Sequence, residues 1–194
     1  MPSYLWYTLD KNLEKVDFNM DCIKVRIDKN STSEDSILSL AGDVVCEFSR
    51  KGLTFSSAES CTGGLVGGKI TAVSGSSAVY FGGIITYTND IKINVLGVDS
   101  ALIDCYTEVS APVACQMAER VREKLSSAVG VSATGFAGPM GGNENDPVGT
   151  VYVGIAAAEK THVYRLSYGE GVKREDIRLM TVEFIFQKLL SLFA

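Results

Sequence analysis

Short apolar runs typical of buried strands alternate along this chain with stretches in which apolar residues recur at helical spacing. This alternation predicts an α/β layered domain, in which helices flank a β-sheet. Two strand-like runs near the end follow each other without a helix between them, so we expect a mixed β-sheet. The expected strands span 53–59, 78–88, 129–135, 150–159 and 161–168, and the expected helices span 31–51, 65–73, 89–98, 110–127 and 173–192.

The first thirty residues have the character of an extension to this domain. Residues 13–28 alternate apolar and polar side chains, which predicts two short strands or a hairpin, and the polar segment "KNSTSEDS" follows. Ser31 and Glu34 have the spacing of a capping box, so we expect the first helix to begin there. The predicted organisation is an N-terminal extension over 1–30 and one domain over 31–194.

The composition excludes several classes of protein. A chain of 194 residues with 46% hydrophobic residues suits one domain with a substantial core. A net charge of −5 argues against a general binder of nucleic-acid backbones. The five cysteines form no CxxC pair, as expected of a reduced cytoplasmic protein without disulfides or a zinc site. No apolar run approaches the ~20 residues of a membrane span, and the first residues lack the order of a signal peptide.

The segment "SSAESCTGGLVGG" (56–68) is the first candidate for chemistry. A strand, a glycine turn and a helix would place Ser60, Cys61 and Thr62 at a helix N-terminus. Free N–H groups there can hold a phosphate or stabilise an oxyanion. A plain capped turn uses the same residue types and is the commoner meaning of one such turn. A nucleotide P-loop is excluded, because Ile70 stands where that motif needs Ser or Thr.

A serine nucleophile at position 60 needs a base. The single histidine, His162, lies in an alternating run that predicts a solvent-facing position on an edge strand. Lysine can serve instead where burial lowers its pKa. Lys92 lies between Ile91 and Ile93, just after a strand that should neighbour the strand before Ser60, and it is the best candidate. An ordinary surface lysine on a short helix fits the same pattern.

Two further segments could bind an anionic ligand. The glycine-rich stretch 133–150 is unusually long for a connection between two strands, and such loops are often functional. Thr134 ends the strand that enters it. Arg174, near the start of the last helix, could clamp a phosphate. A surface loop and a solvated arginine are the simpler alternatives.

Six short segments of the chain occur in the order and with the spacing of one known family. They are "AESCTGG" (58–64), "SGSSAVYFGGIITYTNDIK" (74–92), "LGV" (96–98), "VS" (109–110), "TGFAGPMGG" (134–142) and "PVGTVYVGIA" (147–156). Together they resemble the C-terminal domain family of the competence- and damage-inducible protein CinA, whose enzymatic members are nicotinamide mononucleotide amidohydrolases. The resemblance covers about residues 33–194 and implies the fold of that domain.

The resemblance also implies a reaction and a set of site residues. The reaction is deamidation of nicotinamide mononucleotide to nicotinic acid mononucleotide and ammonia, with an acyl-enzyme on Ser60 and Lys92 as the base. It requires no metal or cofactor, and N–H groups at the helix start would stabilise the oxyanion. Tyr87 and Thr134 complete the implied catalytic set, and the implied substrate-binding residues are Cys61, Thr62, Gly63, Gly64, Ser76, Gly135, Gly138 and Arg174. The expected partners are the small nucleotide and further copies of the chain in a cytoplasmic homo-oligomer, with no nucleic acid and no membrane.

The sequence departs from the family pattern at two places. Gly82 stands where many members carry an arginine, and the usual "GDR" before the last helix reads "GEGVKR", ending at Arg174. The nucleotide-pyrophosphatase domain of larger CinA proteins has no counterpart in residues 1–30, so a stand-alone domain is expected. Two alternatives stay open: a non-catalytic nucleotide-binding or protein-interaction module of the same fold, and a thiol enzyme that uses Cys61.

Overall fold

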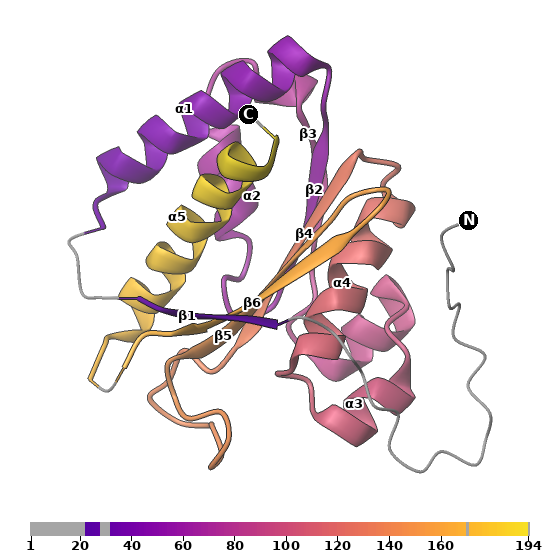
Figure 1. Cartoon of the computed structure of the whole chain (residues 1–194), viewed down its shortest axis with the longest axis vertical. Coiled ribbons are helices and arrows are strands. Elements are labelled where there is room, and N and C mark those ends of the chain that lie inside the picture. Colours follow the sequence, from indigo (N-terminus) through magenta and orange to yellow (C-terminus); the bar gives the residue numbers. More distant parts are fainter. Residues whose placement is uncertain (1–21, 28–31, 170, 194) are drawn as a thin grey trace.

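A six-stranded mixed sheet forms the centre of the protein (Figure 1). The computed structural model describes residues 22–27, 32–169 and 171–193. The strands are β1 (Cys22–Arg26), β2 (Phe55–Glu59), β3 (Tyr80–Ile85), β4 (Val129–Gly135), β5 (Thr150–Ala156) and β6 (Thr161–Ser167), in the spatial order β1-β6-β5-β4-β2-β3. β3, β2 and β4 are parallel, whereas β5 is antiparallel to both neighbours and β1 is parallel to β6. The α/β fold with a mixed sheet is therefore confirmed.

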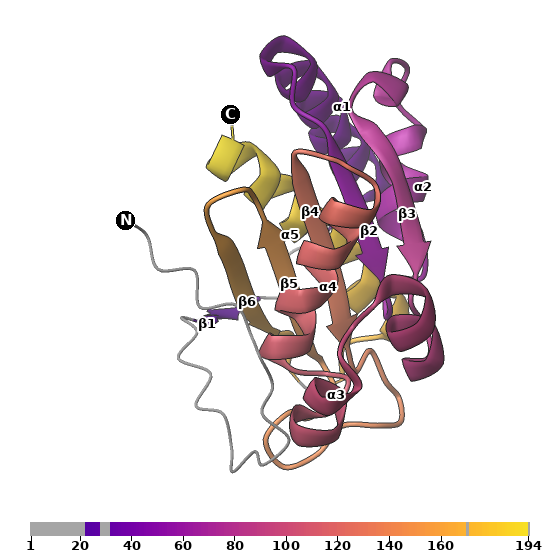
Figure 2. The ribbon, with the colours of Figure 1, turned by 90° about the vertical axis from the view of Figure 1, so that its right-hand side faces the viewer.

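Helices cover both faces of this sheet and give the protein three layers (Figure 2). They are α1 (Glu34–Lys51), α2 (Leu65–Thr71), α3 (Ser100–Tyr106), α4 (Ala111–Lys124) and α5 (Arg174–Phe193), with a 3-10 turn η1 (Ser76–Ala78) and a π-helical turn η2 (Ile91–Leu96). α1, α2 and α5 lie on one face, and α3 and α4 lie on the other (Figure 1). The predicted helices at 110–127 and 173–192 are confirmed, and α3 is a helix that the pattern did not predict.

β2 is completely buried because it contributes to both cores. Phe55 packs in the core under α1 and α5, and Ala58 packs in the core under α3 and α4. Burying a phenylalanine side chain of this kind contributes about 1.5–3 kcal/mol. The hydroxyl of Ser56 faces α4 and donates to the carbonyl of Val121 at 3.2 Å. A central strand with polar residues is thus accommodated by giving each polar group a partner.

The first helix begins two residues later than the capping-box spacing predicts. Its N-cap is Ser33, whose hydroxyl accepts from the N–H of Ser36 at 3.0 Å. The hydroxyl of Ser36 accepts in return from the N–H of Ser33 at 3.2 Å. Ser31, the expected cap, lies outside the described residues. The serine-rich segment offers several caps at similar spacing, and the reciprocal serine pair is the one that forms.

The edge of the sheet differs from the prediction. His162 lies on β6, which is an inner strand, because β1 pairs in parallel with it along Cys22–Arg26. The expectation of an edge-strand histidine was therefore wrong, and the extension supplies the edge instead. Of the hairpin predicted at 13–28, the structure describes β1 and Ile27. The other residues of that range lie outside the described part of the chain. In the described part of the chain, no helix is long and apolar enough to cross a membrane.

Candidate functional site

Ser60 is the first residue after β2, and it lies in a tight turn. Its N–H donates to the carbonyl of Ala133 at 2.9 Å, which continues the pairing of β2 with β4 by one residue. Its carbonyl accepts from the N–H of Gly63 at 3.1 Å. Gly63 and Gly64 have φ angles of 61° and 95°, which a residue with a side chain adopts only with strain. The side chain of Ser60 is buried against the carboxyl end of the sheet, with 9% of the residue exposed.

The structure brings Lys92 into contact with this serine. Its Nζ lies 3.2 Å from Ser60 Oγ and donates to the carbonyl of Thr86 at 2.9 Å. Lys92 is 1% exposed, so the surface-lysine interpretation is wrong. The residue lies on η2, and π-helical turns of this kind are frequent at functional sites.

The surroundings of Lys92 favour its neutral amine. Burial lowers the pKa of Lys92, and the nearby Glu108 and Cys61 oppose that shift only in part. Among the described residues, no carboxylate lies within 4.0 Å of its Nζ. An ammonium group without a salt-bridge partner is costly to bury, so the proton is released more easily. A neutral amine beside a hydroxyl can take the hydroxyl proton.

Two other candidate groups are placed unfavourably for catalysis. Burial raises the pKa of the Cys61 thiol to about 12, so the thiol stays protonated at neutral pH. His162 pairs with Ile155 on β5, and Ile155 pairs with Val131 on β4. Val131 in turn pairs with Ser57 on β2, so the histidine lies three strands from β2, roughly 14 Å at the usual spacing. Neither group can activate Ser60.

The residues expected at a phosphate come together from three segments. Nη1 of Arg174 donates to the carbonyl of Gly138 at 2.9 Å, and its Nη2 donates to the hydroxyl of Tyr87 at 3.2 Å. Arg178, one helical turn further along α5, donates from Nη2 to the carbonyl of Thr62 at 2.9 Å. Arg178 is not among the residues predicted from the sequence, although its spacing of four residues places it on the same helix face as Arg174.

The comparisons with known proteins agree with this architecture. The model of the CinA C-terminal domain matches residues 37–193. The chain belongs to the CinA C-terminal domain family. A CinA-like protein of Cyanothece sp. is 42% identical over 170 residues, and one of Salinibacter ruber is 54% identical over 117 residues. These matches cover 86% and 60% of this chain but only 40% and 28% of the relatives, so the chain spans two fifths of their length or less.

Solved structures of the CinA superfamily share the fold. The competence/damage inducible protein CihA from Agrobacterium tumefaciens has a TM-score of 0.78 and 38% identity, over 80% of this chain and 94% of that chain. A CinA superfamily protein from Escherichia coli has the same TM-score with 26% identity, over 84% of this chain and 94% of that chain. The expected family and fold are therefore confirmed.

Not every residue that the CinA resemblance implied lies near Ser60. Thr134 follows Ala133 on β4 and so lies beside Ser60, but it is fully buried and its hydroxyl donates to the carbonyl of Glu108 at 2.8 Å. Ser76 begins η1, just before β3, so it lies beside the amino ends of β2 and β3. Ser60 lies at the opposite, carboxyl end. The structure therefore does not bring Ser76 to the Ser60–Lys92 pair within one copy of this CinA domain.

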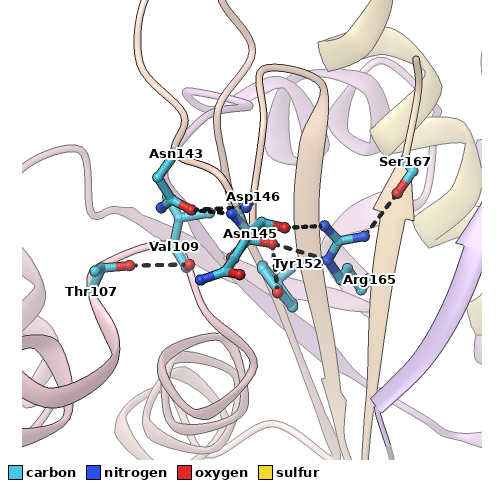
Figure 3. Close-up of polar contacts among 8 residues, drawn as sticks. All are labelled: Thr107, Val109, Asn143, Asn145, Asp146, Tyr152, Arg165 and Ser167. Carbon is cyan, nitrogen blue, oxygen red and sulfur yellow. Dashed lines mark hydrogen bonds and ion pairs between the residues drawn. The ribbon is translucent and has the colours of Figure 1, made fainter.

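The glycine-rich loop after β4 is fastened at its far end (Figure 3). Asp146 accepts from the hydroxyl of Tyr152 at 2.8 Å and from Nε of Arg165 at 2.9 Å. Arg165 also donates to the carbonyl of Asn145 at 2.7 Å, and Asn143 Oδ1 accepts from the N–H groups of both Asn145 and Asp146. The loop is thereby tied to β5 and β6. At its start, a Cβ on Gly135 would lie 2.7 Å from the carbonyl of Thr150, so this position requires glycine.

The helix after Ser60 is arranged differently from the expectation. α2 begins at Leu65, so Ser60, Cys61 and Thr62 belong to the turn before it. The carboxylate of Glu59 accepts from the N–H groups of Gly64, Val66 and Gly67. The expectation of free N–H groups at the helix start was therefore wrong, because a side chain of the protein occupies them. Within the described chain, no oxygen accepts from the N–H of Cys61 or Thr62, so these two amides are the candidate donors for an oxyanion.

Residues that commonly bind metal ions do not gather here. In the described ranges, no three His, Cys, Asp or Glu side chains are grouped as a metal site requires.

Proposed function

We propose that this chain hydrolyses the carboxamide of nicotinamide mononucleotide, with Ser60 as nucleophile and Lys92 as base. The observation that carries the proposal is the 3.2 Å contact between Ser60 Oγ and Lys92 Nζ in a buried setting that favours the neutral amine. A serine and a neutral lysine form a complete nucleophile–base pair. The choice of substrate rests on membership of the CinA C-terminal domain family.

The geometry suggests a sequence of proton and bond changes. Lys92 takes the hydroxyl proton as Ser60 Oγ attacks the carboxamide carbon. The oxyanion that forms would accept from the N–H groups of Cys61 and Thr62, and one such donor typically contributes ~100–1,000-fold in rate. The amide C–N bond then breaks, and Lys92 returns the proton to the departing ammonia. Water attacks the acyl-enzyme while Lys92 takes its proton, and Lys92 returns that proton to Ser60 Oγ as the ester bond breaks and nicotinic acid mononucleotide leaves.

The anionic end of the substrate needs cations at a second position. Arg174 is oriented by its contacts with Gly138 and Tyr87, and its exposed guanidinium can form charge-assisted hydrogen bonds with a phosphate. The loop that carries Gly138 is tied to β5 and β6 through Asp146. This arrangement favours a nucleotide over the free base nicotinamide.

The test is release of ammonia from nicotinamide mononucleotide by the purified chain, with nicotinamide riboside as a matched substrate that lacks the phosphate. We expect turnover of the nucleotide and much weaker turnover of the riboside. Ser60→Ala and Lys92→Met should each remove nearly all activity, and the double variant should be little slower than either, because the two groups act as a unit. Binding of the nucleotide without ammonia release by the native chain would instead support the non-catalytic module.

A further inference from the structure

A buried carboxylate stands immediately before the nucleophile. Glu59 is 3% exposed, and its two oxygens accept four hydrogen bonds. The N–H groups of Gly64, Val66 and Gly67 donate to it at 2.9, 3.0 and 3.0 Å, and the hydroxyl of Ser57 donates at 3.1 Å. Among the described residues, no Lys or Arg forms a salt bridge with it. The four donors, three of them backbone N–H groups at the start of α2, leave neither oxygen of this buried carboxylate without a partner.

The carboxylate belongs to a network that the chain makes room for. The hydroxyls of Ser57 and Tyr80 lie 2.7 Å apart, so Tyr80 is linked to Glu59 through Ser57. A Cβ on Gly67 would lie 2.9 Å from the Tyr80 hydroxyl, and a Cβ on Gly83 would lie 2.5 Å from it. Both positions therefore need glycine for the Tyr80 hydroxyl to reach Ser57.

The network determines the shape of the turn that carries Ser60. Glu59 holds the turn from inside, because its bonds to Gly64, Val66 and Gly67 draw the start of α2 toward the end of β2. Arg178 holds the turn from the α5 side through the carbonyl of Thr62. The turn between these two anchors contains Ser60 and the two amides without an oxygen acceptor.

We infer that Glu59 is a positioning residue for the nucleophile turn, which fixes Ser60 Oγ and the amides of Cys61 and Thr62 relative to each other. The inference rests on the proposed function in taking Ser60 as the nucleophile. A carboxylate at the start of α2 also denies that position to the substrate phosphate. Glu59 should therefore affect the chemical step and leave substrate affinity almost unchanged.

The variant that tests this is Glu59→Gln, which keeps the shape of the side chain but directs an NH₂ group at backbone donors. We expect kcat to fall roughly 100-fold, the loss expected when reacting groups are misplaced by about 1 Å. KM for nicotinamide mononucleotide should stay within about twofold, a split that general loss of structure would not produce. The rate at which a fluorophosphonate labels Ser60 should fall by a similar factor, because this reaction uses the same hydroxyl and donors.

The matched control is Glu119→Gln on α4. Glu119 is a half-buried carboxylate that accepts from Thr161 at 2.8 Å and from the Cys115 thiol at 3.4 Å. The Glu119→Gln variant should have a lower unfolding temperature than the native protein, with the same kcat and the same labelling rate. Should Glu59→Gln label and turn over at native rates, the inference is overturned while the proposed function stands. If the native protein is labelled at Ser60 in a way that requires Lys92 but releases no ammonia from nicotinamide mononucleotide, the proposed substrate is wrong. In that case, slower labelling of Glu59→Gln than of the native protein still supports the inference.

Discussion

Replacement of the buried lysine by methionine should inactivate the protein and stabilise it most at low pH. Lys92→Met keeps an unbranched, flexible side chain that is one atom shorter, and it removes the amine that must be desolvated. Activity should fall by roughly 10⁴-fold or more, because the nucleophile loses its base. The stability change follows from the lowered pKa of Lys92, which burial causes.

The magnitude of that change depends on pH in a defined direction. In the native chain, the unfolded state binds more protons than the folded state between the lowered pKa of Lys92 and the ordinary value of 10.5. Stability therefore rises with pH across that window, by at most about 1.4 kcal/mol per pH unit for one proton. Lys92→Met lacks this dependence. Lys92→Met should therefore exceed the native chain in free energy of unfolding by the largest amount below the window. This difference should decline steadily as pH approaches 10.5.

Urea unfolding followed by circular dichroism, with reductant, at intervals from pH 6 to 10 measures this difference. Lys124→Met is the matched control, because it removes the same charge from an exposed position on α4. A dependence that comes from net charge alone would appear in both variants. A difference between Lys92→Met and the native chain that stays flat from pH 6 to 10 would show that Lys92 titrates normally, and the general-base argument would then fail.

Two further variants test the neighbours of the dyad. Cys61→Ala should keep most of the turnover in the ammonia assay, because the thiol is protonated at neutral pH and alanine retains the backbone N–H; an inactive Cys61→Ala beside an active Ser60→Ala would favour the thiol enzyme instead. Arg174→Met should raise KM for nicotinamide mononucleotide roughly 10- to 100-fold, as loss of a charge-assisted hydrogen bond predicts. KM for nicotinamide riboside should hardly change, and an equal rise for both substrates would mean that Arg174 orders the loop and does not bind the phosphate.

The sequence predicts where the strands lie along the chain better than it predicts which strands pair with each other. Apolar runs identify β2, β4 and the β5–β6 pair because burial selects for those residues locally. The pairing of β1 with β6 joins distant parts of the chain, and no local pattern encodes it, which is why His162 was misplaced at an edge. α3 was missed because its seven residues are too short to show a helical period.

The candidate site divides in the same way. Ser60 and Lys92 are recognisable because their residue types carry the chemistry and each follows a predicted strand. Glu59 and Arg178 escape prediction, because they act on the backbone amides and a carbonyl of a turn whose shape appears only in three dimensions. The residue pattern cannot distinguish a helix start that is open to an anionic ligand from one whose N–H groups already bind a carboxylate of the same chain.

The topology explains why these segments meet at one end of the sheet. β3, β2 and β4 are adjacent and parallel, so their carboxyl ends lie along one edge. The connection from β2 to β3 runs through α2 on one face, whereas the connection from β3 to β4 runs through α3 and α4 on the other face and passes over β2 (Figure 2). The two connections leave this edge toward opposite faces, and open α/β sheets place ligands where connections diverge in this way. Ser60 follows β2, Lys92 follows β3 and the loop with Gly138 follows β4, so these three parts of the proposed site come from strands that end at this point.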